Sequence, residues 1–210
     1  MSEDKTAKNS LSLNNMPIIQ LKLVFWGPGK SGKTTSFHCL QKNFSNASLT
    51  GGYSVETTSG RTLWQDSIFL SFSASVKGYQ YSIAIQVVTC TGQERFLSTR
   101  EYVLEGADGV IFVADSDPSR TTQNKRSFRE LISFMKSHQT PYIIQLNKRD
   151  LENKIGILEF KKELKLPVEE TFPDGIKVVY PTIAIKCTGI VECFQDLLSK
   201  MIFQQFKEDL

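Results

Sequence analysis

The chain has 210 residues, 40% of them hydrophobic, and a formal net charge of +3. That length suits a single α/β domain with a sizeable core, and the small net charge, without a long Lys/Arg block, argues against a nucleic-acid partner. No apolar run approaches the roughly 18 residues that span a bilayer, the N-terminus is polar, and lipidation motifs are absent. We therefore expect a cytoplasmic protein without an intrinsic membrane anchor.

The first predicted elements are a polar arm, a strand and a helix. Residues 1–16 contain few bulky apolar side chains, which predicts a flexible arm ahead of one domain over residues 17–210. Residues 18–26 predict a strand, and residues 34–45 carry apolar side chains at helical spacing and predict a helix.

Residues 27–34, between this strand and this helix, have the sequence GPGKSGKT and match G-x-x-x-x-G-K-[S/T]. Glycines let a loop wrap closely around an anion, because they tolerate positive φ and lack a Cβ. Successive N–H groups and the start of the next helix then bind phosphate. Lys33 is expected to reach the β- and γ-phosphates and Thr34 to ligate Mg²⁺. The alternative is a Gly-rich turn without a ligand. The residues expected at the phosphates are Gly29, Lys30, Ser31, Gly32, Lys33, Thr34 and Thr35.

The next segment, residues 45–65, is rich in Gly, Ser and Thr and has no periodicity. Connections of that length in a compact domain are usually functional or mobile. It is followed by two alternating runs, residues 67–76 and 79–88, with Lys77-Gly78 between them. This spacing predicts a tight antiparallel hairpin.

Two short apolar runs, residues 110–114 and 142–146, are typical of strands that are buried on both faces. Two helical stripes accompany them: Phe128, Leu131, Ile132 and Met135, and then Phe194, Leu197, Leu198 and Met201. Strands that alternate with helices predict an α/β fold. We expect a mainly parallel six-stranded sheet with one antiparallel hairpin strand and helices on both faces.

Two motifs follow strand-like runs and suit a guanine nucleotide. In TCTGQ, Gly92 would give a backbone N–H to a γ-phosphate and Gln93 would orient an attacking water. In NKRD, the Asp150 carboxylate would accept hydrogen bonds from N1–H and the 2-amino group of guanine. Adenine lacks that pair of donors and would leave the carboxylate unpaired. Lys148 would lie along the purine ring, and Asn147 would join this loop to the phosphate loop.

A third, weaker motif is AIKC at residues 184–187, where the backbone N–H groups of Ile185 and Lys186 would meet guanine O6. Each motif alone is also an ordinary turn. Together they occur in the order of a guanine-nucleotide fold, each at the carboxyl end of a strand-like run, where open α/β sheets bind ligands. The chain therefore predicts a P-loop G domain.

The four cysteines, Cys39, Cys90, Cys187 and Cys193, lack the paired spacing of metal ligands. This favours free thiols in a reducing cytoplasm.

On these motifs the chain resembles the Ras-like small GTPases over nearly its whole length, and among them the MglA-type proteins of bacteria and archaea. The resemblance is carried by GPGKSGKTT (27–35), GRTLWQD (60–66), TCTGQ (89–93), GADGVIFVADSDP (106–118) and LNKRDL (146–151). Thr89 is the most specific residue, because most small GTPases carry Asp there and the MglA type carries Thr.

The resemblance implies a switch that binds GTP or GDP with Mg²⁺ and hydrolyses GTP slowly. It also implies a roadblock-fold activator and effectors of unknown identity. Thr62 would close on Mg²⁺ and the γ-phosphate, Arg61 would act as an arginine in cis, and Gln93 would orient water. Because Thr89 is neutral, another carboxylate is expected to support the metal, and Asp66 is the candidate.

Some features depart from the pattern or leave alternatives open. Thr91 stands where the MglA type commonly has Pro, and residues 184–186 differ from the usual Ser-Ala-Lys. No function is assigned to residues 166–182. A pseudo-GTPase that binds nucleotide and acts as an interaction module is the main alternative, and a P-loop ATPase or kinase is a further one.

Overall fold

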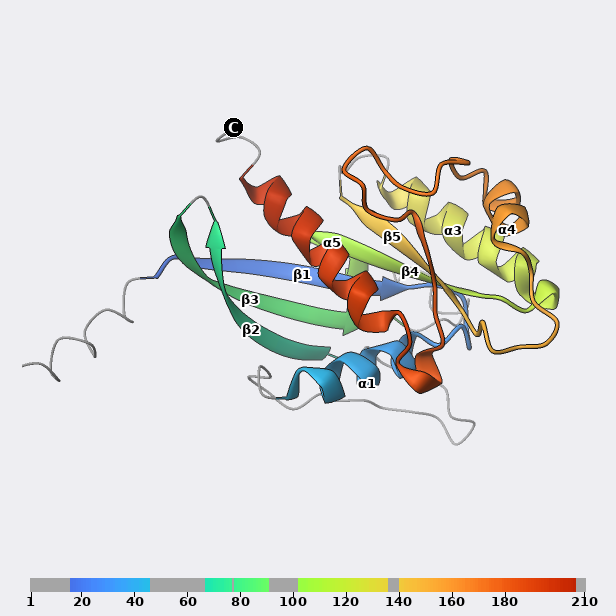
Figure 1. Ribbon diagram of the computed structural model, residues 1–210, viewed down its shortest axis with the longest axis horizontal. Helices are drawn as coiled ribbons and strands as arrows, with labels where there is room; N and C mark the ends of the chain where they lie inside the picture. The colour runs from blue at the N-terminus through green and yellow to red at the C-terminus, as the bar shows by residue number, and fades with distance from the viewer. Residues whose placement is uncertain (1–15, 46–66, 77, 91–101, 136–139, 207–210) are drawn as a thin grey trace, which may run out of the picture.

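The computed structural model describes residues 16–45, 67–76, 78–90, 102–135 and 140–206. Six strands form one sheet in the order β2-β3-β1-β4-β5-β6 (Figure 1). Their bounds are β1 Ile18–Trp26, β2 Ser67–Val76, β3 Tyr79–Thr89, β4 Gly109–Asp115, β5 Tyr142–Asn147 and β6 Val179–Pro181. All neighbouring strands are parallel except β2 and β3, which are antiparallel. The predicted six-stranded, mainly parallel sheet with one antiparallel hairpin strand is confirmed.

The central strands are buried on both faces. Every residue of β4 is buried, as are the last four residues of β1 and the last five of β5. Strands covered on both sides contain continuous apolar runs, which is why the sequence located them closely. The β2–β3 hairpin turns at Gly78, whose φ of 83° suits glycine.

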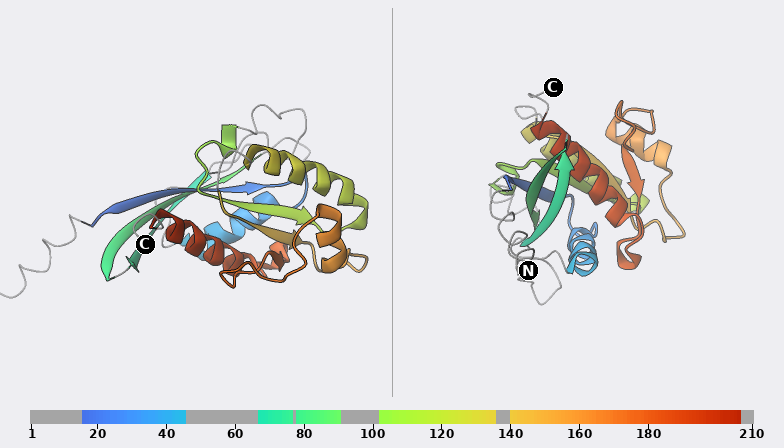
Figure 2. Two further views of the ribbon diagram at one scale, coloured as in Figure 1. Left: turned by 90° about the horizontal axis from the view of Figure 1, so that it is seen from above. Right: turned by 60° about the vertical axis from the view of Figure 1, so that its left-hand side comes forward.

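Helices cover both faces of the sheet (Figure 2). On one face, α1 (Lys33–Asn43) and α5 (Ile190–Gln205) pack Phe37, Leu40 and Leu197 into one apolar cluster. On the other face, α3 (Thr121–Met135) and α4 (Ile157–Leu164) contribute Leu131 and Phe160 to a second cluster. None of the helices in the described part of the chain is long and apolar enough to cross a membrane.

Several elements differ from the sequence expectation in bounds or were not expected. The helix predicted at residues 34–45 spans Lys33–Asn43. Helix α4 and two short 3-10 helices, η4 (Pro118–Arg120) and η5 (Ala184–Lys186), were not predicted. Helices as short as these contain too few turns for apolar residues to recur at a recognisable helical spacing. The expected arm lies, except for Met16, outside the described residues, as do residues 46–65 of the Gly/Ser/Thr-rich segment.

The expectation of four free thiols is wrong. Cys39 of α1 and Cys187, the residue after η5, form a disulfide, while Cys90 and Cys193 are free and buried. The two bonded cysteines are 148 residues apart in the chain. No local spacing pattern links them, and only the packing of α1 against η5 brings them together.

The first testable prediction concerns the packing of α5 on the sheet. A Cβ on Gly109 of β4 would lie 2.5 Å from Met201 Sδ and 3.3 Å from Leu197 Cγ, so this contact is tight. Leu197→Ala would leave a cavity there and is expected to lower the free energy of unfolding by about 2–5 kcal/mol. Leu158→Ala, at a position 64% exposed in α4, is the matched control and should change it by less than about 0.5 kcal/mol. Urea titrations followed by circular dichroism measure both, and equal losses would contradict this packing.

Candidate nucleotide-binding site

Two glycines shape the loop between β1 and α1. Gly32 has φ 105°, and a Cβ there would lie 2.1 Å from Asn147 Nδ2. Gly27 has φ 149°, and its Cβ would lie 2.2 Å from the carbonyl oxygen of Val113. Backbone conformation and close approach therefore both require glycine at these two positions.

The start of α1 suits an anion. No described side chain caps this helix, and its first turn contains no acidic residue. The N-termini of helices favour negative charge, because their first N–H groups have no acceptor within the helix. Thr34 lies half-buried in this first turn, directly after Lys33.

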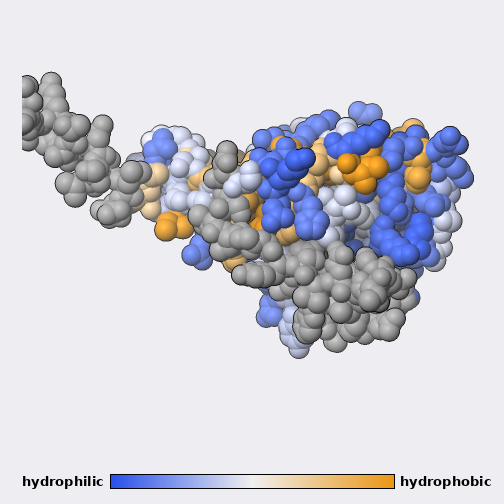
Figure 3. Space-filling view, turned by 90° about the horizontal axis from the view of Figure 1, so that it is seen from below, coloured by the Kyte–Doolittle hydropathy of each residue, from blue (hydrophilic) through white to orange (hydrophobic). Residues whose placement is uncertain are grey.

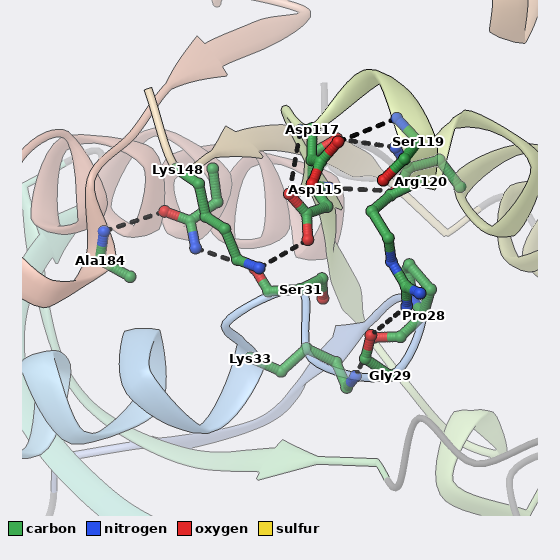
Figure 4. A network of polar contacts seen from close by, with 12 residues as sticks. Pro28, Gly29, Ser31, Lys33, Asp115, Asp117, Ser119, Arg120, Lys148 and Ala184 are labelled. Carbon is green, nitrogen blue, oxygen red and sulfur yellow. Dashed lines mark hydrogen bonds and ion pairs between the residues drawn. The ribbon is translucent and has the colours of Figure 1, made fainter. Parts of the chain in front are cut away.

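The Lys33 ammonium is held at the phosphate loop. Its side chain folds back, and Nζ donates to the carbonyl oxygens of Gly27 at 3.0 Å and Pro28 at 2.8 Å (Figure 4). Lys33 is only 6% exposed. A cation held in this way beside a helix N-terminus suits a phosphate group.

Arg120, the last residue of η4, braces this loop from another part of the chain. Its Nη2 donates to the carbonyl oxygen of Gly29 at 2.9 Å (Figure 4). A role for Arg120 was not predicted from the sequence. No local pattern marks it, because the contact joins residues 91 positions apart.

Asn147, at the end of β5, connects three segments through one amide. Its Nδ2 donates to the carbonyl oxygen of Ser31 in the phosphate loop at 2.8 Å. Its Oδ1 accepts from the backbone N–H of Ala184 at 2.9 Å and from the Thr182 hydroxyl at 3.3 Å. Asn147 is 2% exposed. The expected link between the NKRD loop and the phosphate loop is therefore present, and it extends to the loop at residues 184–186.

The next residue, Lys148, is held by a carboxylate that the sequence analysis missed. Lys148 has φ 64°, and its Nζ pairs with Asp115 Oδ2 at 2.6 Å (Figure 4). Asp115 ends β4 and is almost fully buried, and its other carboxylate oxygen accepts from the Asp117 N–H at 3.1 Å. Asn124 bonds both backbone groups of Asp115. The available signal was an acidic residue directly after the apolar run at residues 110–114.

Asp117 lies next to this pair and caps η4. Its carboxylate accepts from the backbone N–H of Ser119 at 2.9 Å. Hydrogen bonds from the Ser119 hydroxyl and N–H lower the pKa of Asp117 below its usual value. Asp117 therefore stays ionised at neutral pH on this edge of the site.

Asp150 and the loop at residues 184–186 lie at the outer end of the site. Asp150 is exposed, and among the described residues no group forms an ion pair with its carboxylate. Ile185 is 72% exposed. The backbone N–H of Lys186 donates to the carbonyl oxygen of Ile183 at 3.0 Å, so it is used within η5. Of the two expected O6 donors, Ile185 is the one whose N–H is not used in this way.

Several predicted residues lie outside the described part of the chain: Arg61, Thr62, Asp66, Gly92 and Gln93. Thr89 is described, and it is buried at the end of β3 beside Phe25 of β1. In the described segments no group of three or more His, Cys, Asp or Glu side chains is placed to hold a metal ion.

Comparison with known proteins agrees with this arrangement. Residues 9–201 match the model of the ADP-ribosylation factor family. The chain is 29% identical to the mutual gliding-motility protein MglA of Myxococcus xanthus over 195 residues, which is 90% of this chain and 94% of that protein. It is 27% identical to the human ADP-ribosylation factor-like protein 4A over 206 residues, 93% of this chain and 94% of that protein. The predicted resemblance to Ras-like small GTPases of the MglA type is confirmed. The chain belongs to the ADP-ribosylation factor family of small GTPases.

Proposed function

We propose that this protein is a cytoplasmic guanine-nucleotide switch that binds GTP and GDP and slowly hydrolyses GTP. The observation that carries the proposal is the Asn147 amide, which holds the phosphate loop, the NKRD loop and the loop at residues 184–186 at one edge of the sheet. A nucleotide has phosphates at one end and a base at the other. Three loops fixed in this way provide a site for both ends.

At the phosphate end, the N–H groups of the loop and of the α1 N-terminus would bind the β-phosphate, with Lys33 contributing a fixed positive charge. The residues present also fit Mg²⁺. The hydroxyls of Thr34 and Thr62 would hold the ion together with phosphate oxygens and water, and the Asp66 carboxylate would support it because Thr89 is neutral. When bound, Mg²⁺ neutralises negative charge on the β- and γ-phosphates.

At the base end, Asp150 would accept hydrogen bonds from N1–H and the 2-amino group of guanine. The ion pair with Asp115 fixes the Lys148 side chain, whose alkyl stem would lie along the purine ring. The Ile185 N–H would donate to O6. The alternative of an ATPase or kinase is disfavoured, because adenine would leave the Asp150 carboxylate without its donors.

Hydrolysis would depend on four residues of the adjoining segments. Gln93 would orient a water molecule that attacks the γ-phosphorus as the bond to the GDP oxygen breaks, giving GDP and inorganic phosphate. Arg61 would stabilise the charge that develops on the transferred group, and Gly92 and Thr62 would contact the γ-phosphate. Loss of the γ-phosphate would release these contacts and change the surface that partners recognise.

The partners we propose are a roadblock-fold activator and effectors that recognise the GTP-bound surface. The activator would stabilise the arrangement in which Arg61 lies at the γ-phosphate. It would therefore not need to supply an arginine of its own. Turnover without it would then be slow, because only a minor fraction of the molecules would have Arg61 at the γ-phosphate.

Asp150→Asn tests the base site. The Asn amide N–H₂ would face one of the two guanine donors, so that a polar group would be left unpaired. We therefore expect GTP and GDP affinity to fall at least about tenfold and the affinity for xanthine nucleotides to rise. Titration with a fluorescent nucleotide measures the affinities. Asp174→Asn, which changes the carboxylate that pairs with Lys200 on α5 and accepts from the Ile176 N–H, is the matched control and should bind like the parent. An unchanged GDP affinity in Asp150→Asn would place the base elsewhere.

Arg61→Ala and Gln93→Leu test hydrolysis separately from binding. Each should slow single-turnover GTP hydrolysis by about tenfold or more, since an arginine in cis accounts for roughly the difference between 10⁻⁴ and 10⁻² s⁻¹ in this fold. GTP affinity should stay within about threefold, because these groups act mainly in the transition state. If Arg61→Ala hydrolyses GTP as fast as the parent, with and without the activator, Arg61 is not a catalytic residue. A parent that binds GTP but never hydrolyses it would favour the pseudo-GTPase.

A further inference from the structure

We propose that Cys39 and Cys187 form a reversible thiol–disulfide site that controls nucleotide exchange by fastening the base loop, residues 184–186, to helix α1. The inference rests on the proposed function, because it assigns a regulatory role at the same nucleotide site. Cys39 lies outside the nucleotide-binding motifs of the sequence, and Cys187 is the last residue of AIKC, where only the backbone of Ile185 and Lys186 was expected to bind the base.

The position of the two cysteines is the first argument. Cys39 lies in α1, the helix that begins at the phosphate loop with Lys33. Cys187 directly follows the base loop and ends η5. Their Cα atoms are 5.6 Å apart, within the range that disulfides require. The bond therefore joins the two elements that would bind opposite ends of the nucleotide.

The base loop is short and closed, so a bond at Cys187 restrains all of it. Ile183 and Thr188 pair across its base through two backbone hydrogen bonds of 3.1 and 3.2 Å. Within it, the Cys187 N–H donates to the carbonyl oxygen of Ala184 at 3.1 Å. A movement of the loop away from the site would carry Cys187 with it and would have to break the bond to Cys39.

The covalent bond adds to a contact that opens more readily. The Asn147 amide joins the phosphate loop to the N–H of Ala184 by hydrogen bonds, and after reduction of the disulfide these would be the link that remains. Hydrogen bonds of this kind break and re-form in local opening, which is the motion that releases a ligand held between loops. The disulfide does not open, so the oxidised protein is expected to sample the released arrangement less often.

Thiol–disulfide exchange would begin at Cys187, because its side chain is more accessible than those of the other three cysteines. Cys187 is half-buried, whereas Cys39, Cys90 and Cys193 are buried. Burial raises the pKa of the Cys193 thiol, which keeps it protonated and unreactive. Asn43 Nδ2 lies 3.5 Å from Cys39 Sγ and donates to it. A donor at this sulfur stabilises the thiolate that forms when the bond is reduced.

The reaction partner is an oxidised low-molecular-weight thiol such as glutathione disulfide. The Cys187 thiolate attacks one sulfur of that disulfide, forms a mixed disulfide and releases one small thiolate. The Cys39 thiolate then attacks the Cys187 sulfur, forms the protein disulfide and releases the second small thiolate. Two protein thiols are oxidised, one small disulfide is reduced, and the two thiol protons pass to the released thiolates. An excess of the reduced small thiol reverses both steps.

The test compares the full-length protein after reduction with reduced glutathione and after oxidation with glutathione disulfide. Peptide mapping under non-reducing conditions, after alkylation of free thiols, should find Cys39 linked to Cys187 only in the oxidised sample. A stopped-flow chase of fluorescent GDP by excess GDP should show release about tenfold slower from the oxidised protein, within the usual range of coupling between two sites. Cys187→Ser and Cys39→Ala should release GDP at the fast rate in both buffers. Cys193→Ser, which keeps the pair, should respond like the parent.

Three results would overturn the inference. One is equal GDP release from reduced and oxidised protein in which the link has been mapped, and another is the absence of any Cys39–Cys187 link. The third is a link that excess reduced glutathione cannot remove from the folded protein, since that would make it a permanent structural bond. If fluorescent GDP binds in neither redox state, the proposed function fails and the regulatory role fails with it, while the peptide map still reports on the cysteine pair independently.

Discussion

The hydrogen bonds of the Asn147 side chain are the interaction on which the rest of the site depends. The amide is buried, and its donor and acceptor sides face different loops. A buried polar group that loses its partner costs about 1–3 kcal/mol, so removing this side chain would leave the carbonyl of Ser31 and the N–H of Ala184 unpaired at once. The same contact explains Gly32, since Asn147 Nδ2 occupies the place where a Cβ would lie.

The sheet brings Asn147 to this position. Parallel strands end at the same edge, and the register of β4 and β5 places Asp115 beside Asn147. The residue after Asn147, Lys148, then meets the Asp115 carboxylate, which fixes the side chain expected along the base. The apolar side chains of these strands pack into the clusters on both faces of the sheet, which holds the two strands in this register. The geometry of the site is thus a consequence of core packing.

The sequence predicted the features that have a local signal. Continuous apolar runs and a two-residue turn located β1 to β5 within a residue or two, and glycine spacing located the phosphate loop. The contacts of Asp115 and Arg120 could not be predicted in this way, because each joins side chains that only the fold brings together. The expectation of free thiols was wrong for the same reason. Cys39 lies in α1 and Cys187 follows η5, and no sequence motif links the two. The parts of the site that would change between GTP and GDP, around Arg61 and Gln93, lie outside the described residues and remain predictions from the sequence.

The central claim is that the loops joined by Asn147 bind a guanine nucleotide. The most direct measurement is to denature the purified protein and identify the released nucleotide by anion-exchange chromatography and mass spectrometry. Small GTPase sites that enclose both phosphates and base commonly retain their ligand through purification when release is slow. The account predicts GDP or GTP in the released fraction. ADP or ATP in its place would contradict the base assignment to Asp150 and with it the proposed switch.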